Sequence, residues 1–378
     1  MKLACLGCGR ERRSDGVTLT CPSCGGLLEV RPSLPDRPRF EGSGVWRYAR
    51  LLPVRRNPVS LGEGATGLHE CLRTKGLYVK HEGENPTGSF KDRGMTVGVT
   101  LARELGRKVV VCASTGNTAA SLSAYAARAG MRAVVLLPAG KVAAGKVAQA
   151  VAHGAELVQI EGNFDRAMAL VRSLERDGRI YILNSLNPYR LEGQKTLAFE
   201  VCEALGRPPD VVVLPVGNGG NVSAIWKGFK EWKAMGFANR LPRMIGVQAA
   251  GAAPVARAFR DGAWLPEPNP QTIATAIRIG DPVNAPKALA AFRDSRGDVA
   301  TVSDEEILES QRWLAKSEGL FVEPASAAPI AYLRRHPHRG TVVAVATGHG
   351  LKDPEAITGR MPKAKAIAPT VAALRRVL

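Results

Sequence analysis

The sequence predicts an α/β protein with two doubly wound parallel-sheet domains and a small separate unit at the N-terminus. From Gly76 onward, short segments rich in β-branched residues alternate with alanine-rich stretches. Strands that alternate with helices form parallel sheets with helices packed on their faces. A length of 378 residues is sufficient for two such domains and an appendage. The expected strands are 77–80, 108–113, 132–138, 156–160, 179–184, 210–215, 244–248 and 341–346.

The helical stretches contain recognisable starts and stops. Ser303 followed by Glu306 predicts a capping box, in which each side chain bonds the backbone of the other residue. Gly130 predicts the end of the helix TAASLSAYAARAG. Ligands of open parallel sheets bind where strands end and helices begin. The loops that follow the strands are therefore expected to carry the functional residues.

Four paired cysteines set residues 1–33 apart from the rest of the chain. They follow the pattern C-x2-C, twelve residues, C-x2-C, with a glycine directly after each pair. This is the ligand spacing of a four-thiolate zinc site, and we expect zinc here instead of disulfides because the cytosol keeps thiols reduced. A proline-rich linker, 32–40, overlaps the end of this segment. The expected zinc ligands are Cys5, Cys8, Cys21 and Cys24.

The formal net charge of +18 raises the question of a nucleic-acid partner. Lysine and arginine are spread along the chain, aromatic residues make up only 5%, and no segment interleaves basic residues with stacking rings. We therefore expect no dedicated nucleic-acid binding. No stretch approaches the roughly 18 apolar residues of a membrane span, and the N-terminus has no apolar signal core. A cytoplasmic protein without a membrane partner is expected.

The loop after the first strand, HEGENPTGSFKDRG, places a lysine at the start of a helix. Thr87 or Ser89 is expected to cap this helix, with Lys91 in its first turn. The helix dipole disfavours a cation there, so the amine has reason to lose its proton, and a neutral lysine attacks carbonyl groups. By spacing alone, a solvated Lys91 paired with Asp92 or Glu84 is the simpler interpretation.

Two further loops favour anion binding. The segment ASTGNTAAS follows a strand and offers several hydroxyl groups and free backbone amides at a helix start, more than one N-cap needs. The segment VLPVGNGGN has three glycines, 217, 219 and 220, whose backbone can form a nest of N–H donors. It lacks the third glycine of a dinucleotide fingerprint, since Val222 and Ser223 stand in its place. One phosphate group fits it better than a pyrophosphate.

Six segments together resemble the threonine synthase family, which has the fold-type II, tryptophan synthase β-like architecture of pyridoxal-phosphate enzymes. The resemblance runs from about Ser60 to the C-terminus. Single segments are shared with threonine dehydratases and cysteine synthases, whereas all six in order, above all TIATAIRIG, are specific. The six are ENPTGSFKDRG, ASTGNTAAS, VGNGGN, TIATAIRIGDPVN, VEPASAA and TGHGLKD.

The resemblance implies a role for each polar position. Lys91 would hold pyridoxal 5'-phosphate, Asn117 would bond its ring hydroxyl, and Thr347 would face its pyridine nitrogen. The phosphate of the cofactor would be bound by Gly217, Asn218, Gly219, Gly220 and Asn221. The substrate of the family, O-phospho-L-homoserine, would be bound by Ser114, Thr115, Thr118, Asn184, Ser185 and Arg190. In the last group, Arg190 is expected to clamp the substrate phosphate.

The resemblance also implies the reaction and the assembly. Phosphohomoserine and water would give threonine and phosphate by γ-elimination and β-hydration, with Lys91 as the general base. A large domain, 34–90 and 191–378, would bind the cofactor, and a smaller mobile domain, 91–190, would close over the substrate. A homodimer is expected from the same analogy.

The sequence departs from the family pattern after TIATAIRIG. Asp281 stands where asparagine is expected, and Asn284 stands near the expected Ser-Trp pair. The departure leaves two other enzyme functions open, a cysteate synthase and a threonine dehydratase-like lyase. A zinc-ribbon nucleic-acid-binding protein is the alternative from a different class, favoured by the charge and the cysteines.

Overall fold

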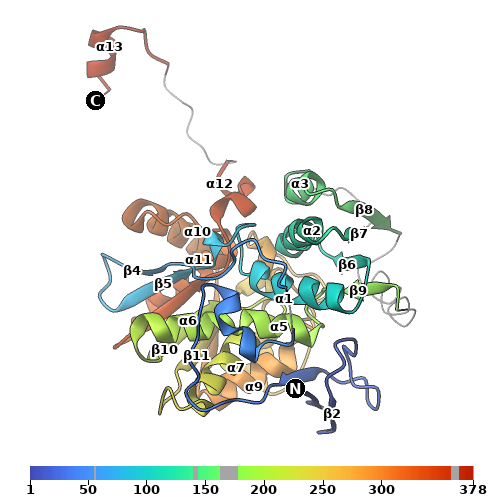
Figure 1. Cartoon of the computed structure of the whole chain (residues 1–378). Coiled ribbons are helices and arrows are strands. Elements are labelled where there is room, and N and C mark those ends of the chain that lie inside the picture. Colours follow the sequence, from blue (N-terminus) through green and yellow to red (C-terminus); the bar gives the residue numbers. More distant parts are fainter. Residues whose placement is uncertain (55–56, 139–143, 162–177, 359–365, 378) are drawn as a thin grey trace.

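The computed structural model describes residues 1–54, 57–138, 144–161, 178–358 and 366–377. Three sheets organise the described residues: a large sheet, a small sheet and an N-terminal ribbon (Figure 1). The expected α/β architecture with parallel sheets is confirmed. The boundaries between the two larger domains stay a prediction.

The large sheet has the strand order β12-β11-β10-β13-β5-β4. All neighbouring strands are parallel except β4 and β5, which pair antiparallel at one edge. The sequence analysis did not predict β4 or β12. The strands are β4 (Leu68–Glu70), β5 (Leu77–His81), β10 (Val211–Pro215), β11 (Arg243–Ala249), β12 (Asp298–Val302) and β13 (Val342–Ala346).

Helices cover both faces of the large sheet, as alternation along β10 shows. Val211 and Val213 belong to the apolar cluster that contains α11, whereas Val212 and Leu214 belong to the cluster that contains α6 and α7. Side chains alternate between the faces of a strand, so each face of β10 is buried under helices. The helices of this part are α6 (Thr196–Leu205), α7 (Gly220–Ala234), α8 (Pro254–Asp261), α9 (Ala285–Asp294), α10 (Asp304–Trp313), α11 (Pro324–Arg335) and α12 (Glu355–Thr358).

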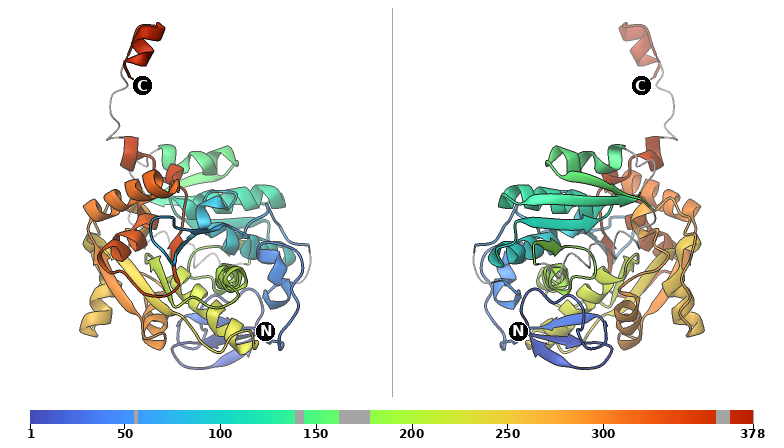
Figure 2. Two further views of the ribbon diagram at one scale, coloured as in Figure 1. Left: turned by 90° about the vertical axis from the view of Figure 1, so that its left-hand side faces the viewer. Right: turned by 90° about the vertical axis from the view of Figure 1, so that its right-hand side faces the viewer.

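The small sheet is entirely parallel, with the order β8-β7-β6-β9. The figures show α2 and α3 beside it, and α1 lies between it and the large sheet (Figures 1 and 2). Its strands are β6 (Val109–Ala113), β7 (Arg132–Pro138), β8 (Glu156–Ile160) and β9 (Ile180–Ile182). The neighbouring helices are α1 (Lys91–Glu104), α2 (Asn117–Ala129), α3 (Ala144–Ala152) and α5 (Pro188–Gln194).

The N-terminal ribbon is a three-stranded antiparallel sheet in the order β2-β1-β3. Its strands are β1 (Lys2–Cys5), β2 (Glu11–Arg13) and β3 (Leu28–Arg31). At the other end of the chain, α13 (Val371–Arg375) stands away from the other elements and buries none of its residues (Figure 2). Among the described residues, no helix has the length and apolar character needed to cross a membrane.

A glycine lets α1 and α5 approach closely, which fixes the positions of the loops that precede these two helices. A Cβ at Gly193 of α5 would lie 1.8 Å from the carbonyl oxygen of Arg93 in α1. Real atoms do not approach so closely, so larger residues here would push the helices apart. Two predicted helix ends are confirmed: Ser303 and Glu306 form a capping box at the start of α10, and Gly130 ends α2 with a left-handed conformation.

Candidate active site

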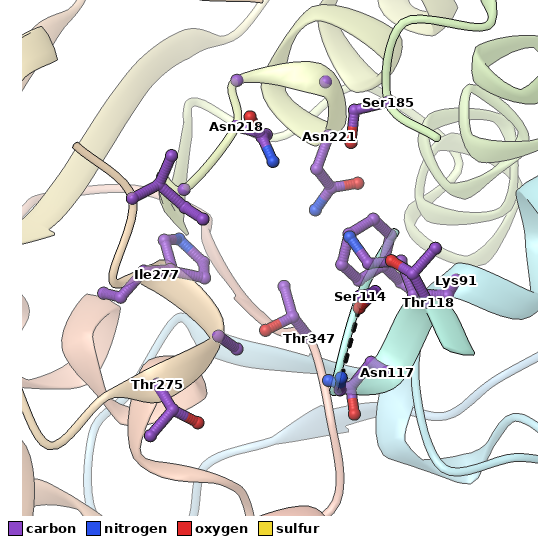
Figure 3. Close-up of a pocket in the computed structure, with 18 of the residues that line it drawn as sticks. Lys91, Ser114, Asn117, Thr118, Ser185, Asn218, Asn221, Thr275, Ile277 and Thr347 are labelled. Carbon is purple, nitrogen blue, oxygen red and sulfur yellow. Dashed lines mark hydrogen bonds between the residues drawn. The ribbon is translucent and has the colours of Figure 1, made fainter. Parts of the chain in front are cut away.

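A cavity of about 550 Å³ opens at the carboxyl ends of strands from both larger sheets (Figure 3). It brings together every residue predicted for the cofactor and the substrate except Arg190. Predicted residues from separate loops thus meet at one place, as ligand sites of parallel sheets do. The predicted residues on its wall are Lys91, Ser114, Thr115, Asn117, Thr118, Asn184, Ser185, Gly217, Asn218, Gly219, Gly220, Asn221 and Thr347.

Lys91 is the first residue of α1, as predicted, and its amine lies 4.1 Å from the ring centre of Phe90. Burial lowers the pKa of Lys91 to about 7, and the positive charge of Arg190 acts in the same direction. The lowered pKa agrees with the predicted neutral amine, and its largest cause is the loss of solvent around the amine. The structure pairs neither of the expected carboxylates with Lys91: Asp92 accepts hydrogen bonds from Thr87 and Ser121, and Glu84 contacts the Gly67 amide and His69.

The loop before Lys91 is fixed to the end of β13. The Phe90 amide donates to the Thr347 carbonyl at 3.0 Å, and the His349 amide donates to the Gly88 carbonyl at 2.9 Å. These bonds hold Thr347 next to Phe90, so that Thr347 and Lys91 line the same cavity. The prediction that Thr87 or Ser89 caps α1 is wrong, since the N-cap is Phe90 and no side chain caps it. Thr87 instead donates its hydroxyl to Asp92 at 2.6 Å.

The segment 217–221 forms a cradle at the start of α7. Gly219 has a φ of 77°, and a Cβ there would lie 2.8 Å from the Asn284 carbonyl oxygen. No side chain caps α7, so its first amides are free for a ligand. Both polar atoms of the Asn221 side chain are buried without a partner among the described residues. Orphaned polar groups beside free amides fit a bound anion.

The start of α2 provides a second set of free amides. Its N-cap is Gly116, and no side chain caps the helix, although Ser114, Thr115 and Thr118 stand nearby on the pocket wall. Ser114 accepts a hydrogen bond from the Gly116 amide at 3.1 Å. The surplus of hydroxyls at this helix start is therefore not explained by capping. A second anion, such as a carboxylate, fits here.

The segment after β9 contributes Asn184 and Ser185. The Asn184 side chain bonds both the amide and the carbonyl of Ala113, each at 3.0 Å, so it ties this segment to the end of β6. Arg190 does not reach the pocket wall, which differs from its predicted contact with substrate. Arg190 is 1% exposed and packs on Gly98 of α1, and its Nε and Nη2 atoms have no hydrogen-bond partner in the described part of the chain. Burial lowers the pKa of Arg190 to about 10.

Glu323 is a pocket residue that the sequence analysis did not single out. The side-chain amide of Asn117 donates to both carboxylate oxygens of Glu323, at 3.0 and 3.3 Å. The Thr347 hydroxyl donates to one of them at 3.3 Å. Burial raises the pKa of Glu323. Its motif, VEPASAA, carried the resemblance, but a glutamate before a helix-starting proline gives no signal of its own that it points into a pocket.

The predicted zinc ligands lie together in the ribbon. The Sγ atoms of Cys5, Cys8, Cys21 and Cys24 are within 4.8 Å of one another, and all four thiols are free. The Cys5–Cys24 and Cys8–Cys21 sulfur distances are 3.5 and 3.7 Å. Sulfurs bound tetrahedrally at about 2.3 Å from one zinc ion lie about 3.8 Å apart, whereas a disulfide needs about 2.05 Å. The geometry fits a metal ion.

Comparison with known proteins decides the family. Residues 59–348 match the family of pyridoxal-phosphate dependent enzymes. A threonine synthase of Methanosarcina acetivorans is 55% identical over 376 residues, which cover 94% of this chain and 93% of the relative. The chain belongs to the threonine synthase family. A threonine synthase of Synechocystis is 54% identical over 353 residues, covering 90% and 91% of the two chains.

Solved structures agree with the fold. The threonine synthase of Escherichia coli superposes with a TM-score of 0.75 and 21% identity, covering 100% of this chain and 99% of the other. The processed form of threonine deaminase isoform 2 from Solanum lycopersicum superposes with a TM-score of 0.66 and 20% identity, covering 88% and 100% of the two chains. Membership of the threonine synthase family makes the chain a lyase that uses pyridoxal phosphate, which confirms that prediction.

The pocket itself fits this cofactor. The amine of Lys91, with its pKa lowered to about 7, faces the same cavity as the cradle at 217–221 and the hydroxyl of Thr347. The orphaned side chain of Asn221 needs a partner. Within one cavity, the aldehyde of pyridoxal phosphate would therefore find an amine, its phosphate would find an anion site, and its ring would find polar contacts.

The departure at Asn284 has a structural explanation. Asn284 is buried, its amide bonds the Asn218 carbonyl at 3.0 Å, and its side chain donates to the Ser185 carbonyl at 2.9 Å. It thus joins the cradle to the segment after β9. The departure does not remove the chain from the threonine synthase family, since the relatives from Methanosarcina acetivorans and Synechocystis are more than half identical to it.

Proposed function

We propose that this threonine synthase family member converts O-phospho-L-homoserine and water into L-threonine and phosphate in the cavity around Lys91. One observation carries the proposal: a lysine with a lowered pKa faces uncapped helix starts of α2 and α7 in one pocket. Those helix starts provide two anion sites, one more than the cofactor phosphate needs. The second suits an amino-acid substrate.

Lys91 would hold the cofactor and move protons during the reaction. When bound, pyridoxal phosphate supplies an electron sink that stabilises the negative charge left after a proton is removed beside the amino group. An amine with a pKa near 7 is partly neutral at neutral pH, which suits a general base. The hydroxyl of Thr347 and the amide of Asn117 would hold the ring, and both lie on the wall beside Lys91.

The two helix starts would divide the anionic groups between them. The cradle at 217–221 suits the cofactor phosphate, because Gly219 leaves room and the Asn221 side chain lacks partners. The start of α2, with Ser114, Thr115 and Thr118, suits the substrate carboxylate. Elimination requires that water is excluded at first, and closure of residues 91–190 over the cavity would do this.

The substrate phosphate would bind near Asn184, Ser185 and Arg190. The guanidinium of Arg190 is buried with two unpaired nitrogens, so an anion that reaches it would satisfy both. Arg190→Ala should raise the KM for phosphohomoserine at least about 10-fold, which corresponds to roughly 1.4 kcal/mol of lost binding. Unchanged turnover and KM would show that Arg190 does not bind the phosphate.

The remaining proposals concern the state of the protein in the cell. Zinc bound by Cys5, Cys8, Cys21 and Cys24 would be structural, because four thiolates leave no open coordination position. A cytoplasmic location suits these thiols, which need a reducing compartment. A homodimer is proposed from the family analogy, and no nucleic acid or membrane takes part in the reaction.

The decisive experiment measures inorganic phosphate and threonine released from O-phospho-L-homoserine. Lys91→Ala should lower kcat by at least about 1000-fold, since the covalent attachment and the base are both lost. It should also abolish the cofactor-modified peptide obtained after borohydride reduction. The matched control is Lys75→Ala at an exposed site, which should behave as wild type. Deamination of threonine without phosphate release from phosphohomoserine would instead indicate a dehydratase.

A further inference from the structure

The N-terminal ribbon is docked on the elements that carry the proposed substrate-binding segment. It lies at one end of the molecule, next to α5 and α9 (Figures 1 and 2). Helix α5 follows Asn184 and Ser185 and contains Arg190, whereas α9 begins directly after Asn284. The ribbon therefore contacts elements next to the proposed phosphate site, and none of its described residues lines the cavity itself.

Two buried tyrosines form the first contact. The hydroxyl of Tyr189 accepts a hydrogen bond from the Gly16 amide at 3.0 Å and lies 3.2 Å from a carboxylate oxygen of Asp15. The hydroxyl of Tyr181 donates to the Gly16 carbonyl at 2.7 Å. Tyr181 and Tyr189 are 2% and 0% exposed. One residue of the ribbon thus joins β9 to α5, the two elements on either side of Asn184 and Ser185.

A buried lysine forms the second contact. Lys287 of α9 donates to the carbonyl oxygen of Leu28 in β3 at 2.7 Å, and its side chain is nearly enclosed. Burying an amine is costly unless it is hydrogen-bonded, so the bond to the Leu28 carbonyl stabilises the contact between α9 and β3. Lys287 lies three residues after Asn284, whose side chain bonds the Ser185 carbonyl. The segment that departs from the family pattern is therefore the segment that meets the ribbon.

The apolar interior of the ribbon continues into the body of the protein. Leu3 and Val30 belong to the same buried cluster as Ile182 and Tyr189. A Cβ at Gly16 would lie 3.2 Å from Leu101 in α1. A shared core is typical of a fixed structural part and not of a tethered module.

We propose that the ribbon is a positioning element for substrate binding: through Tyr181, Tyr189 and Lys287 it holds the segment 184–190 in the geometry that binds the substrate phosphate. A metal ion held by the four thiolates would stabilise the fold of the ribbon, so its occupancy would affect the order of this segment. Among the described residues, these three ribbon contacts do not include the cofactor cradle at 217–221, which lies at the start of α7. The inference rests on the proposed function for its substrate, while the docking contacts stand independently of it.

The test uses the full-length, cofactor-loaded protein with the double variant Tyr181→Phe/Tyr189→Phe and, separately, Lys287→Met. Loss of one or two hydrogen bonds should raise the KM for phosphohomoserine roughly 3- to 30-fold, with kcat within about twofold. The visible absorbance of bound cofactor should not change. The control is Glu11→Ala, which breaks only the exposed pairs of Glu11 with Lys2 and Arg31.

Amide hydrogen exchange gives a readout that needs no substrate. Residues 184–194 should exchange faster in the double variant and after metal removal by a chelator, and zinc should restore the slow rate. Unchanged exchange of this segment in both cases would overturn the inference. Equal losses of kcat and of cofactor absorbance would also overturn it, because they indicate general unfolding. If wild-type protein does not turn over phosphohomoserine, the proposed function fails, while the exchange result still decides the role of the ribbon.

Discussion

At the scale of single residues, the tertiary surroundings of Lys91 lower the pKa of its amine. Burial is the largest cause, and the charge of Arg190 acts in the same direction, whereas the sequence position alone predicted only an effect of the helix dipole. The carboxylate of Glu323 acts in the opposite direction. Neither charged residue lies near Lys91 along the chain, so sequence spacing could not predict these effects.

The lowered pKa of Lys91 predicts how cofactor-free protein captures pyridoxal phosphate. The neutral amine is the reactive form, so the capture rate should rise with pH and level off above a midpoint near 7. The rise in visible absorbance after mixing measures this rate. Arg190→Met removes a neighbouring positive charge and should move the midpoint upward. A midpoint near about 10.4, the usual value for lysine, would contradict the structure.

Glu323 is expected to orient the ring contacts of the cofactor. Its carboxylate accepts hydrogen bonds from the side-chain NH2 group of Asn117, and these bonds fix the orientation of that amide. Glu323→Gln keeps the shape but removes the charge, so the cofactor should bind roughly 10-fold more weakly. Titration of pyridoxal phosphate into cofactor-free protein, followed by visible absorbance, checks this. Ser310→Ala, at a buried site on α10, is a control that should leave affinity unchanged.

At the scale of elements, the regular parts of the fold could be predicted and the irregular ones could not. All eight expected strands form, and most of them bury their β-branched residues, although β8 is largely exposed. The short edge strand β4 was missed, since three residues with partial exposure give no periodic pattern. The cap of α1 was predicted wrongly because Thr87 bonds Asp92, a partner that the tertiary fold supplies. Likewise, the loops with anion-binding residues were recognisable, but the buried position of Arg190 was not.

The close approach of α1 and α5 predicts an unusually sensitive glycine. Gly193→Ala should destabilise the protein by about 2–4 kcal/mol, because its Cβ would lie 1.8 Å from a rigid backbone carbonyl. Urea unfolding followed by circular dichroism measures the loss. Gly116→Ala is the control for stability, since a Cβ there meets nothing within 4 Å. A change below about 0.5 kcal/mol in Gly193→Ala would show that the helices separate without cost.

At the scale of the whole molecule, four buried charged residues, here called the charge square, join α5 to α7, the helix that begins at the cofactor cradle. Lys195 and Lys227 each contact both Glu192 and Glu231 at 2.6 or 2.7 Å. Glu192 lies on α5, whereas Lys227 and Glu231 lie on α7, the helix that begins at the cradle. Two positive and two negative charges balance, so the charge square is neutral as a unit. Each member depends on the other three.

This balance predicts the effect of removing one charge. Glu192→Gln leaves two buried lysines with one carboxylate, so the free energy of unfolding should fall by about 3–5 kcal/mol. Urea unfolding of the cofactor-free protein measures it, with Glu11→Gln at an exposed pair as the control expected to leave stability nearly unchanged. The double variant Glu192→Gln/Lys227→Met leaves one positive and one negative charge, Lys195 and Glu231. Its free energy of unfolding should therefore recover part of the loss, because no buried charge is left without a partner. If the double variant were destabilised by the sum of both single changes, the four residues would act independently, and α5 and α7 would be joined by packing alone.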